Sequence, residues 1–88
     1  MSVYSQIQYP REARDKGEGG QVLISWTVDP EGRVRKIRLE RDPGSGMGKE
    51  VLRVFKEMSK QVRWQPGQHN GQPVAVRLVA PITFRVEG

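Results

Sequence analysis

The residues that could carry chemistry in this chain are few, and none of them stands in a pattern that a reaction needs. His69 is the only histidine and cysteine is absent, so neither a transition-metal cluster nor a cysteine-based site can form. The serines lack the neighbours that mark an activated nucleophile, and no pair of carboxylates stands out for acid–base work. We therefore expect a protein that is not an enzyme and that has neither a metal nor a cofactor.

The loop Gly44-Ser45-Gly46-Met47-Gly48-Lys49 resembles a phosphate-binding loop in one respect. It lies between a predicted strand and a predicted helix, which is the context that such a loop needs. However, the spacing between its outer glycines is one residue short, and Glu50 stands where Ser or Thr would bind magnesium. A carboxylate there would also repel phosphate. Nucleotide binding is therefore rejected.

The charge balance raises a nucleic-acid partner as an alternative. Fifteen Lys and Arg against ten Asp and Glu give a net charge of +5, which permits anionic partners without requiring them. The second predicted strand is rich in cations, and Trp26 and Trp64 could stack bases. These cations are Arg33, Arg35, Lys36, Arg38 and Arg41. Because both tryptophans follow apolar stripes, we expect them in the core and expect no nucleic-acid partner.

The 88 residues allow a single domain, residues 1–88, with residues 1–9 as an extended N-terminal segment. No run of 18 or more apolar residues occurs, and the first residues show neither the basic nor the apolar region of a signal peptide. The abrupt start suggests a piece of a longer chain.

Five elements that must position any site are predicted from periodicity and turn residues. A short helix over Pro10–Lys16 precedes strands over Gln21–Asp29 and Arg33–Glu40, which form a hairpin. A long helix covers Lys49–Val62, and a long strand covers Pro73–Val86. The fold class is thus predicted as α+β, a three-stranded antiparallel sheet with the helices on one face.

The apolar residues of these elements define the expected core. Each set recurs at the period of its element, two for strands and three to four for the long helix. They are Ala13 in the short helix, Val22, Ile24, Trp26, Val28, Ile37 and Leu39 in the hairpin, and Val51, Leu52, Phe55, Met58 and Val62 in the long helix.

Pro81 indicates that the last strand is an edge of the sheet. Proline has no N–H, so it is tolerated where that donor would point away from the neighbouring strand. The backbone groups of Arg77, Val79, Thr83 and Arg85 then point outward as well. Such an edge is either guarded against aggregation by residues such as Arg77, Pro81 and Arg85, or used to bind an extended peptide. The pattern alone favours neither.

The order and spacing of these motifs resemble the C-terminal domain of the TonB family, over Gln6 to Val86. An acidic turn that ends in glycine and an aromatic-x-Pro-Gly segment after the long helix are the most specific parts. The matching motifs are Gln8-Tyr9-Pro10 with Ala13 and Gly17, Gly20-Gln21-Val22, Asp29-Pro30-Glu31-Gly32-Arg33-Val34, Arg63-Trp64-Gln65-Pro66-Gly67 and the closing apolar strand.

The resemblance implies a periplasmic domain whose parent protein is anchored in the bacterial inner membrane and crosses the periplasm on a Pro-rich linker. The N-terminal part of such a parent works with ExbB and ExbD, which harvest the proton motive force. The domain grips the TonB box of TonB-dependent outer-membrane transporters, which take up iron-siderophores, haem or cobalamin. Related domains also occur in TolA-like envelope adaptors and in sensor proteins, and these remain the alternative.

The resemblance also implies where the partner binds. The TonB box would add as a strand beside Val74–Val86, close to the segment before Tyr9-Pro10. Pro81 is a departure from several members, and it would cost an added strand one backbone hydrogen bond, about 0.5–1.5 kcal/mol. An open edge also allows a homodimer by strand exchange. The implied partner-binding residues are Gln6, Gln8, Tyr9, Pro10, Val74, Val76, Arg77, Leu78, Val79, Thr83 and Arg85.

Overall fold

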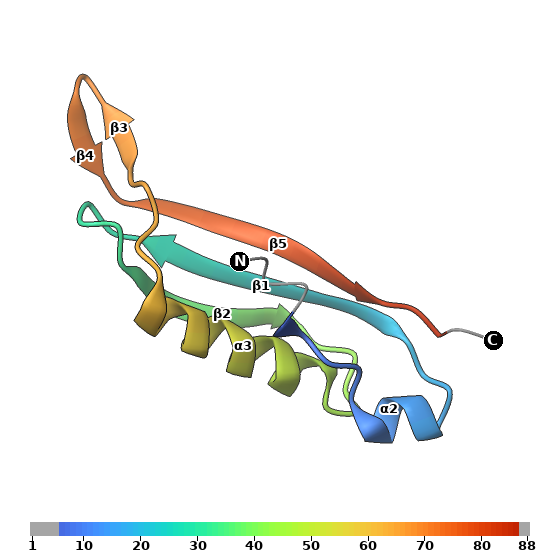
Figure 1. The fold of residues 1–88 in the computed structure, drawn as a ribbon. Coiled ribbons are helices and arrows are strands. Elements are labelled where there is room, and N and C mark those ends of the chain that lie inside the picture. Colours follow the sequence, from blue (N-terminus) through green and yellow to red (C-terminus); the bar gives the residue numbers. More distant parts are fainter. Residues whose placement is uncertain (1–5, 87–88) are drawn as a thin grey trace.

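Two helices and five strands follow one another along residues 6–86, the part of the chain that the computed structural model describes (Figure 1). A three-stranded sheet is accompanied by two helices and one short two-stranded hairpin, so the α+β class is confirmed. The elements are α2 (Arg11–Asp15), β1 (Gly20–Val28), β2 (Val34–Arg41), α3 (Met47–Gln61), β3 (Gly67–His69), β4 (Gln72–Val74) and β5 (Val76–Phe84). The extended conformation expected for residues 1–9 falls mostly outside the described residues, and Gln6 is helical rather than extended.

The main sheet has the order β2-β1-β5, and both pairings are antiparallel. β1 is the central strand, and its alternation follows the sequence prediction. Val22, Ile24, Trp26 and Val28 are all buried, in one cluster with Val51 and Phe55 of α3, so they lie on the face that α3 covers. A central strand that is apolar on one face and polar on the other fixes which face the helices must occupy.

α3 packs along β1 and β2 and supplies much of the core (Figure 1). Val51 and Phe55 are buried as predicted, and Met47 is completely buried at the start of the helix. The prediction for Val62 was wrong, because the helix ends at Gln61 and Val62 has an extended backbone with 39% of its surface exposed. The buried apolar residues of α3 that the sequence pattern missed are Met47 and Val54. Ala13 anchors α2 in the same core, as predicted.

β2 pairs with β1 through two register shifts, and each shift inserts one extra residue in β2. At the first shift Lys36 is the extra residue, with a left-handed φ of 53°. The insertion lets Val34 and Ile37, three residues apart, both turn toward the core. Strict alternation would have placed them on opposite faces, so the bulge reconciles the sequence with the fold.

The long strand predicted over Pro73–Val86 is divided at Ala75 in the structure. Because β1 ends at Val28, opposite Val76, the residues before Val76 have no partner in β1. β4 instead folds back onto β3 through Asn70-Gly71, whose φ values of 51° and 76° are those of a tight hairpin turn. Val74 therefore pairs with Gly67 in this hairpin and does not belong to the long edge strand.

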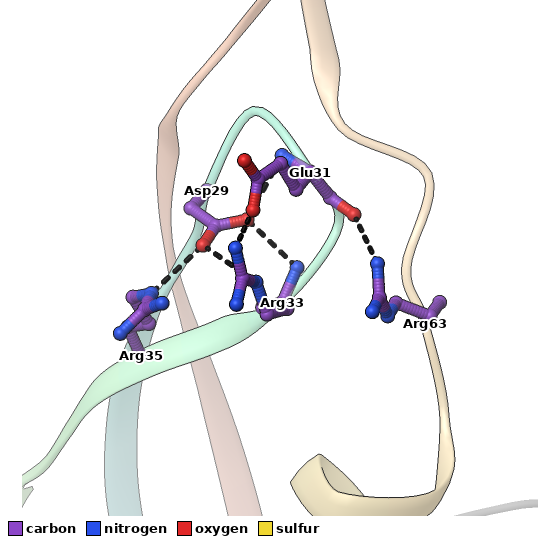
Figure 2. Close-up of polar contacts among 5 residues, drawn as sticks. All are labelled: Asp29, Glu31, Arg33, Arg35 and Arg63. Atoms are coloured by element: carbon purple, nitrogen blue, oxygen red, sulfur yellow. Dashed lines mark hydrogen bonds and ion pairs between the residues drawn. The ribbon is translucent and has the colours of Figure 1, made fainter.

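The turn between β1 and β2 is held by one carboxylate. Asp29 Oδ1 accepts hydrogen bonds from the backbone N–H groups of Glu31 and Arg33, each at 2.9 Å, and Oδ2 accepts one from Arg35 Nε at 2.7 Å (Figure 2). The hydrogen bond from Arg35 and the backbone N–H of Arg33 hold the pKa of Asp29 below its ordinary value. A charged Asp29 thus stabilises the turn.

The segment that follows α3 packs directly on this turn. The guanidinium of Arg63 donates to the carbonyl of Glu31 at 3.2 Å (Figure 2). The backbone N–H of Trp64 donates to the carbonyl of Gly32 at 2.8 Å. Gly32 has φ of 82°, and a Cβ there would lie 2.2 Å from the carbonyl oxygen of Trp64. The two most specific motifs of the sequence therefore contact each other, which gives them a role in the fold.

Candidate functional site

β5 is an edge of the main sheet, as predicted. It pairs with β1 on one side, and no strand among residues 6–86 pairs with its other side. Val79 has 62% of its surface exposed and Leu78 has 36%. An exposed edge that carries apolar side chains is the type of surface to which an extended peptide can add as a further strand.

The register shows which backbone groups of β5 face away from β1. Nine consecutive pairs join the two strands without a bulge, and Pro81 lies opposite Leu23. Since Pro81 offers no N–H to β1, its position belongs to the outward-facing set. The uninterrupted register extends this set to Val79 and Thr83, and to Arg77 at the far end.

The side chain of Arg77 lies over the sheet instead of projecting from its edge. Its guanidinium donates to Thr27 Oγ1 at 2.8 Å and to Ser25 Oγ at 2.7 Å. Ser25 in turn donates to Glu40 Oε1 at 2.7 Å and is only 4% exposed, on the face away from α3. Arg77 thus covers a polar cluster that ties β5 to β1 and β2. Alternation alone gave no signal for this contact.

The segment before α2 lies against the C-terminal end of β5. Ile7 and Tyr9 line a hollow of about 230 Å³ together with Ile82–Arg85. The ring of Tyr9 meets that of Phe84 edge-on at 5.5 Å, and its hydroxyl donates to the carbonyl of Glu18. Tyr9 is therefore fixed beside the end of the edge strand.

The other site residues implied by the resemblance fall in different surroundings. The backbone N–H of Gln8 donates to Glu50 Oε2 at 2.8 Å, so this residue is tied to α3. Pro10 is the residue that precedes the first turn of α2, and Gln6 is exposed. The structure thus gathers Tyr9, Thr83 and Arg85 around one hollow, and places Val76, Arg77, Leu78 and Val79 at the other end of β5.

Two further hollows adjoin Tyr9, and sequence reasoning missed both. One, of about 360 Å³, is lined by Tyr9, Arg14, Arg85 and Val86. The other, of about 420 Å³, is rich in cations. It is lined by Gln8, Tyr9, Pro10, Arg11, Arg14, Gly46, Lys49, Glu50 and Arg53. These cations come from α2 and α3, so no local motif could have shown that they share a surface.

Both tryptophans lie in the core. Trp26 is 5% exposed and packs against Phe55 and Trp64, with ring centroids 4.9 and 5.6 Å apart, so the core position expected for both tryptophans is confirmed. Within residues 6–86 no three His, Cys, Asp or Glu side chains are grouped to hold a metal. Over the same residues, no helix has the length and apolar character that crossing a membrane requires.

These features define a small α+β domain in which β5 is an edge strand and the segment with Ile7 and Tyr9 packs beside its end. The chain matches the family model described as "Gram-negative bacterial TonB protein C-terminal" over residues 5–86. It therefore belongs to this family, and the resemblance found in its motifs is confirmed.

A curated relative and two solved structures agree with this assignment. The protein TonB of Vibrio cholerae is 36% identical over 89 residues, which cover all of this chain and 35% of that protein. The chain thus spans about a third of the length of this relative. A solution structure of the Helicobacter pylori TonB C-terminal domain (residues 179–285) matches with a TM-score of 0.76 at 23% identity, over 98% of this chain and 75% of that one. The Pseudomonas aeruginosa TonB C-terminal domain matches with a TM-score of 0.65 at 28% identity, over 93% and 80%.

Proposed function

We propose that this domain is the partner-gripping module of a TonB-type energy transducer. It binds the TonB box of an outer-membrane transporter as an added strand along β5 and carries out no chemistry itself. The observation that carries the proposal is the edge position of β5, which has nine residues in unbroken register on β1 and no further strand among residues 6–86 beyond it in the sheet. Membership of the TonB family supports the choice of partner.

The rest of the transducer would lie outside this domain. The parent protein would be anchored in the inner membrane, where ExbB and ExbD supply the energy of the proton motive force, and the domain would work in the periplasm. Tension on the bound TonB box would then open the transporter for an iron-siderophore, haem or cobalamin. The likeness to TonB of Vibrio cholerae over the whole chain supports this setting.

Strand addition depends on the outward backbone groups of β5. Each backbone hydrogen bond contributes about 0.5–1.5 kcal/mol net, and outward groups recur at every second residue. Pro81 provides no donor, so a docked peptide would rely on the N–H groups of Val79 and Thr83 on either side of it. Side-chain contact with the exposed Val79 would add apolar burial.

Titration of the ¹⁵N-labelled domain with a synthetic TonB-box peptide tests the proposal. We expect the largest amide shifts in Val76–Phe84 and in Gln6–Tyr9. In the variant Val79→Pro the edge loses one further donor without losing a hydrogen bond to β1, and the peptide should bind about three- to tenfold more weakly. Val79→Thr keeps the N–H and serves as the matched control.

Two outcomes would contradict strand addition along β5. Peptide binding that leaves the amides of Val76–Phe84 unshifted would place the contact elsewhere. The same holds if Val79→Pro and Val79→Thr bind the peptide with equal affinity.

A further inference from the structure

The three hollows around Tyr9 form a continuous surface that begins at the end of β5. The hollow against Ile82–Arg85 shares Arg85 with the 360 Å³ hollow. That hollow shares Arg14 with the 420 Å³ hollow between α2 and α3. A peptide that leaves the edge of β5 at this end therefore meets first Arg85, then Arg14, and then the largest hollow.

The 420 Å³ hollow, called the cationic hollow below, has an excess of positive charge. Its cations are Arg11, Arg14, Lys49 and Arg53, and among the described residues that line it Glu50 is the one acid.

Glu50 does not compensate this excess, because its two oxygens are already engaged. Arg53 donates to both of them at 2.8 Å, and the backbone N–H of Gln8 donates to Oε2. The hydrogen bonds from Arg53 lower the pKa of Glu50, so the carboxylate is charged. Its negative charge compensates that of Arg53 and leaves the other cations of the hollow uncompensated.

Arg11, Arg14 and Lys49 are left with no ion pair to any residue between 6 and 86, and the same is true of Arg85. Elsewhere in this part of the chain, some cations are paired: Lys16 binds Glu12, and Arg33 and Arg35 bind Asp29. Other cations also lack an ion pair within residues 6–86, but none of them lines the three hollows: Lys36, Arg38, Arg41, Lys56, Lys60 and Arg63. Arg11, Arg14, Lys49 and Arg85 differ from these because they line the path that leaves β5.

We propose that the partner segment next to the docked strand is acidic and that its carboxylates bind in the cationic hollow. This inference rests on the proposed function and adds the chemistry of the partner. Guanidinium groups bind carboxylates with two parallel hydrogen bonds. Each exposed ion pair changes affinity by less than about fivefold, so the effect needs several carboxylates that face several cations. Continuity with the strand-binding edge favours a peptide over a free anion or a lipid headgroup.

A set of four peptides tests the inference. Each contains the same TonB-box core with four added residues, either Asp-Glu-Asp-Glu or the neutral Asn-Gln-Asn-Gln, at its N-terminal or its C-terminal end. One end of the docked peptide leaves β5 beside Arg85. At that end, the peptide with the acidic extension should bind about tenfold more tightly at low salt than the peptide with the neutral extension. At 0.5 M NaCl this gain should fall to about twofold or less, because exposed charges are screened.

Two double variants locate the effect. Arg14→Gln with Lys49→Gln removes two charges from the cationic hollow and should reduce the gain to about threefold or less. Arg38→Gln with Arg41→Gln removes two charges of β2 that line none of the three hollows, and controls for the general loss of positive charge. All four residues are exposed, so both variants should fold.

The outcomes separate this inference from the proposed function. If the core peptide shifts the amides of β5 but neither acidic extension tightens binding, the inference fails and the proposed function stands. If the core peptide does not bind β5, both fail. An equal loss of the gain in the two double variants would also overturn the inference. So would binding to phosphatidylglycerol vesicles that depends on Arg14 and Lys49, without any effect of the acidic extensions.

Discussion

The two edges of the sheet flank the same central strand and yet differ in regularity. β5 follows β1 through nine successive pairs, whereas β2 is interrupted by two register shifts, one with Lys36 at φ 53°. Bulges twist an edge away from further pairing. Because both edges share β1, the difference must come from the sequences of β2 and β5 themselves.

The side chains of the two edges differ in the same sense. The register shifts of β2 place Arg35, Arg38 and Arg41 opposite Thr27, Ser25 and Leu23, so all three arginines share the face away from α3. β5 instead presents the exposed Val79 in a stretch without register shifts. Charge and bulges are two common ways to guard an edge. β2 uses both, which leaves β5 as the edge fit to accept a strand.

The largest effect should come from the turn that fixes β2. Gly32→Ala places a Cβ 2.2 Å from the carbonyl oxygen of Trp64 at a φ of 82°, so the turn or the segment after α3 must move. We expect a loss of at least about 3 kcal/mol in the free energy of unfolding, because the left-handed backbone alone costs about 1–2 kcal/mol. Urea denaturation measures it.

Gly71→Ala is the matched control for that variant. Gly71 also has a positive φ, 76°, but a Cβ there would meet nothing within 4 Å. The expected loss is only the backbone cost, about 1–2 kcal/mol. Equal losses in the two variants would mean that the contact between Gly32 and Trp64 does not hold β2 in place.

The bulge at Lys36 gives the next largest effect. Lys36→Val puts a β-branched residue at φ 53° and should cost about 1–2 kcal/mol of unfolding free energy, while Lys36→Gly should be neutral or stabilising. Both changes remove the same charge, so the difference between them reports the backbone. If Lys36→Val is as stable as Lys36→Gly, the bulge is not needed and β2 is as regular in solution as β5.

Much of this fold could be predicted from the sequence, because β1 and α3 bury one face each. Val22, Ile24 and Trp26 recur at the period of a strand, and Val51 and Phe55 at that of a helix, and all five are buried. Pro81 likewise identified β5 as an edge. These features appear in the local periodicity of the sequence, and the residues that form the apolar pattern are the ones that are buried in the folded domain.

The remaining features depend on contacts between distant segments. The bulge at Lys36 could not be predicted because the residue with the positive φ is a lysine and not a glycine. The strands of the β3–β4 hairpin have three residues each, which is too short to show alternation. The long C-terminal strand is interrupted at Ala75 because β1 ends at Val28, opposite Val76. The residues next to Ala75 in the sequence give no sign of this interruption. The cationic hollow combines Arg14 with Lys49, which only the packing of α2 beside α3 brings together.

A smaller effect is expected on self-association, where the two edges should differ in how strongly each supports dimerisation. If two copies pair, we expect them to pair through β5, since it is the edge without register shifts. Val79→Lys should then weaken dimerisation about fivefold, because a charge on the exposed edge opposes pairing. Arg38→Val, which adds an apolar residue to β2, should leave it unchanged. Sedimentation equilibrium over a range of concentrations measures both, and stronger association in Arg38→Val would show that β2 is not guarded by its bulges.

The smallest expected effect is a loss of stability at low pH. It should affect β2, which is bound by the carboxylate of Asp29, and not β5. Asp29 holds Arg35 of β2, and its pKa is lowered from the ordinary 3.8 by that hydrogen bond and by the N–H of Arg33. A lowered pKa in the folded state means that the stabilisation is present above about pH 3.8 and is lost as the pH falls through the folded value. β5 has no such carboxylate among its nine residues.

Below pH 3.8 the β1–β2 turn should therefore loosen before β5 leaves β1. In Asp29→Asn the stability measured by urea denaturation should change less between pH 4 and pH 2 than in the unmodified protein, because one titrating group is gone. The amide shifts of Arg33 and Arg35 should also follow the titration of Asp29, while those of Val76–Phe84 stay constant. A steeper acid loss in Asp29→Asn, or β5 amides that titrate together with those of β2, would show that the two edges respond to acid as one unit.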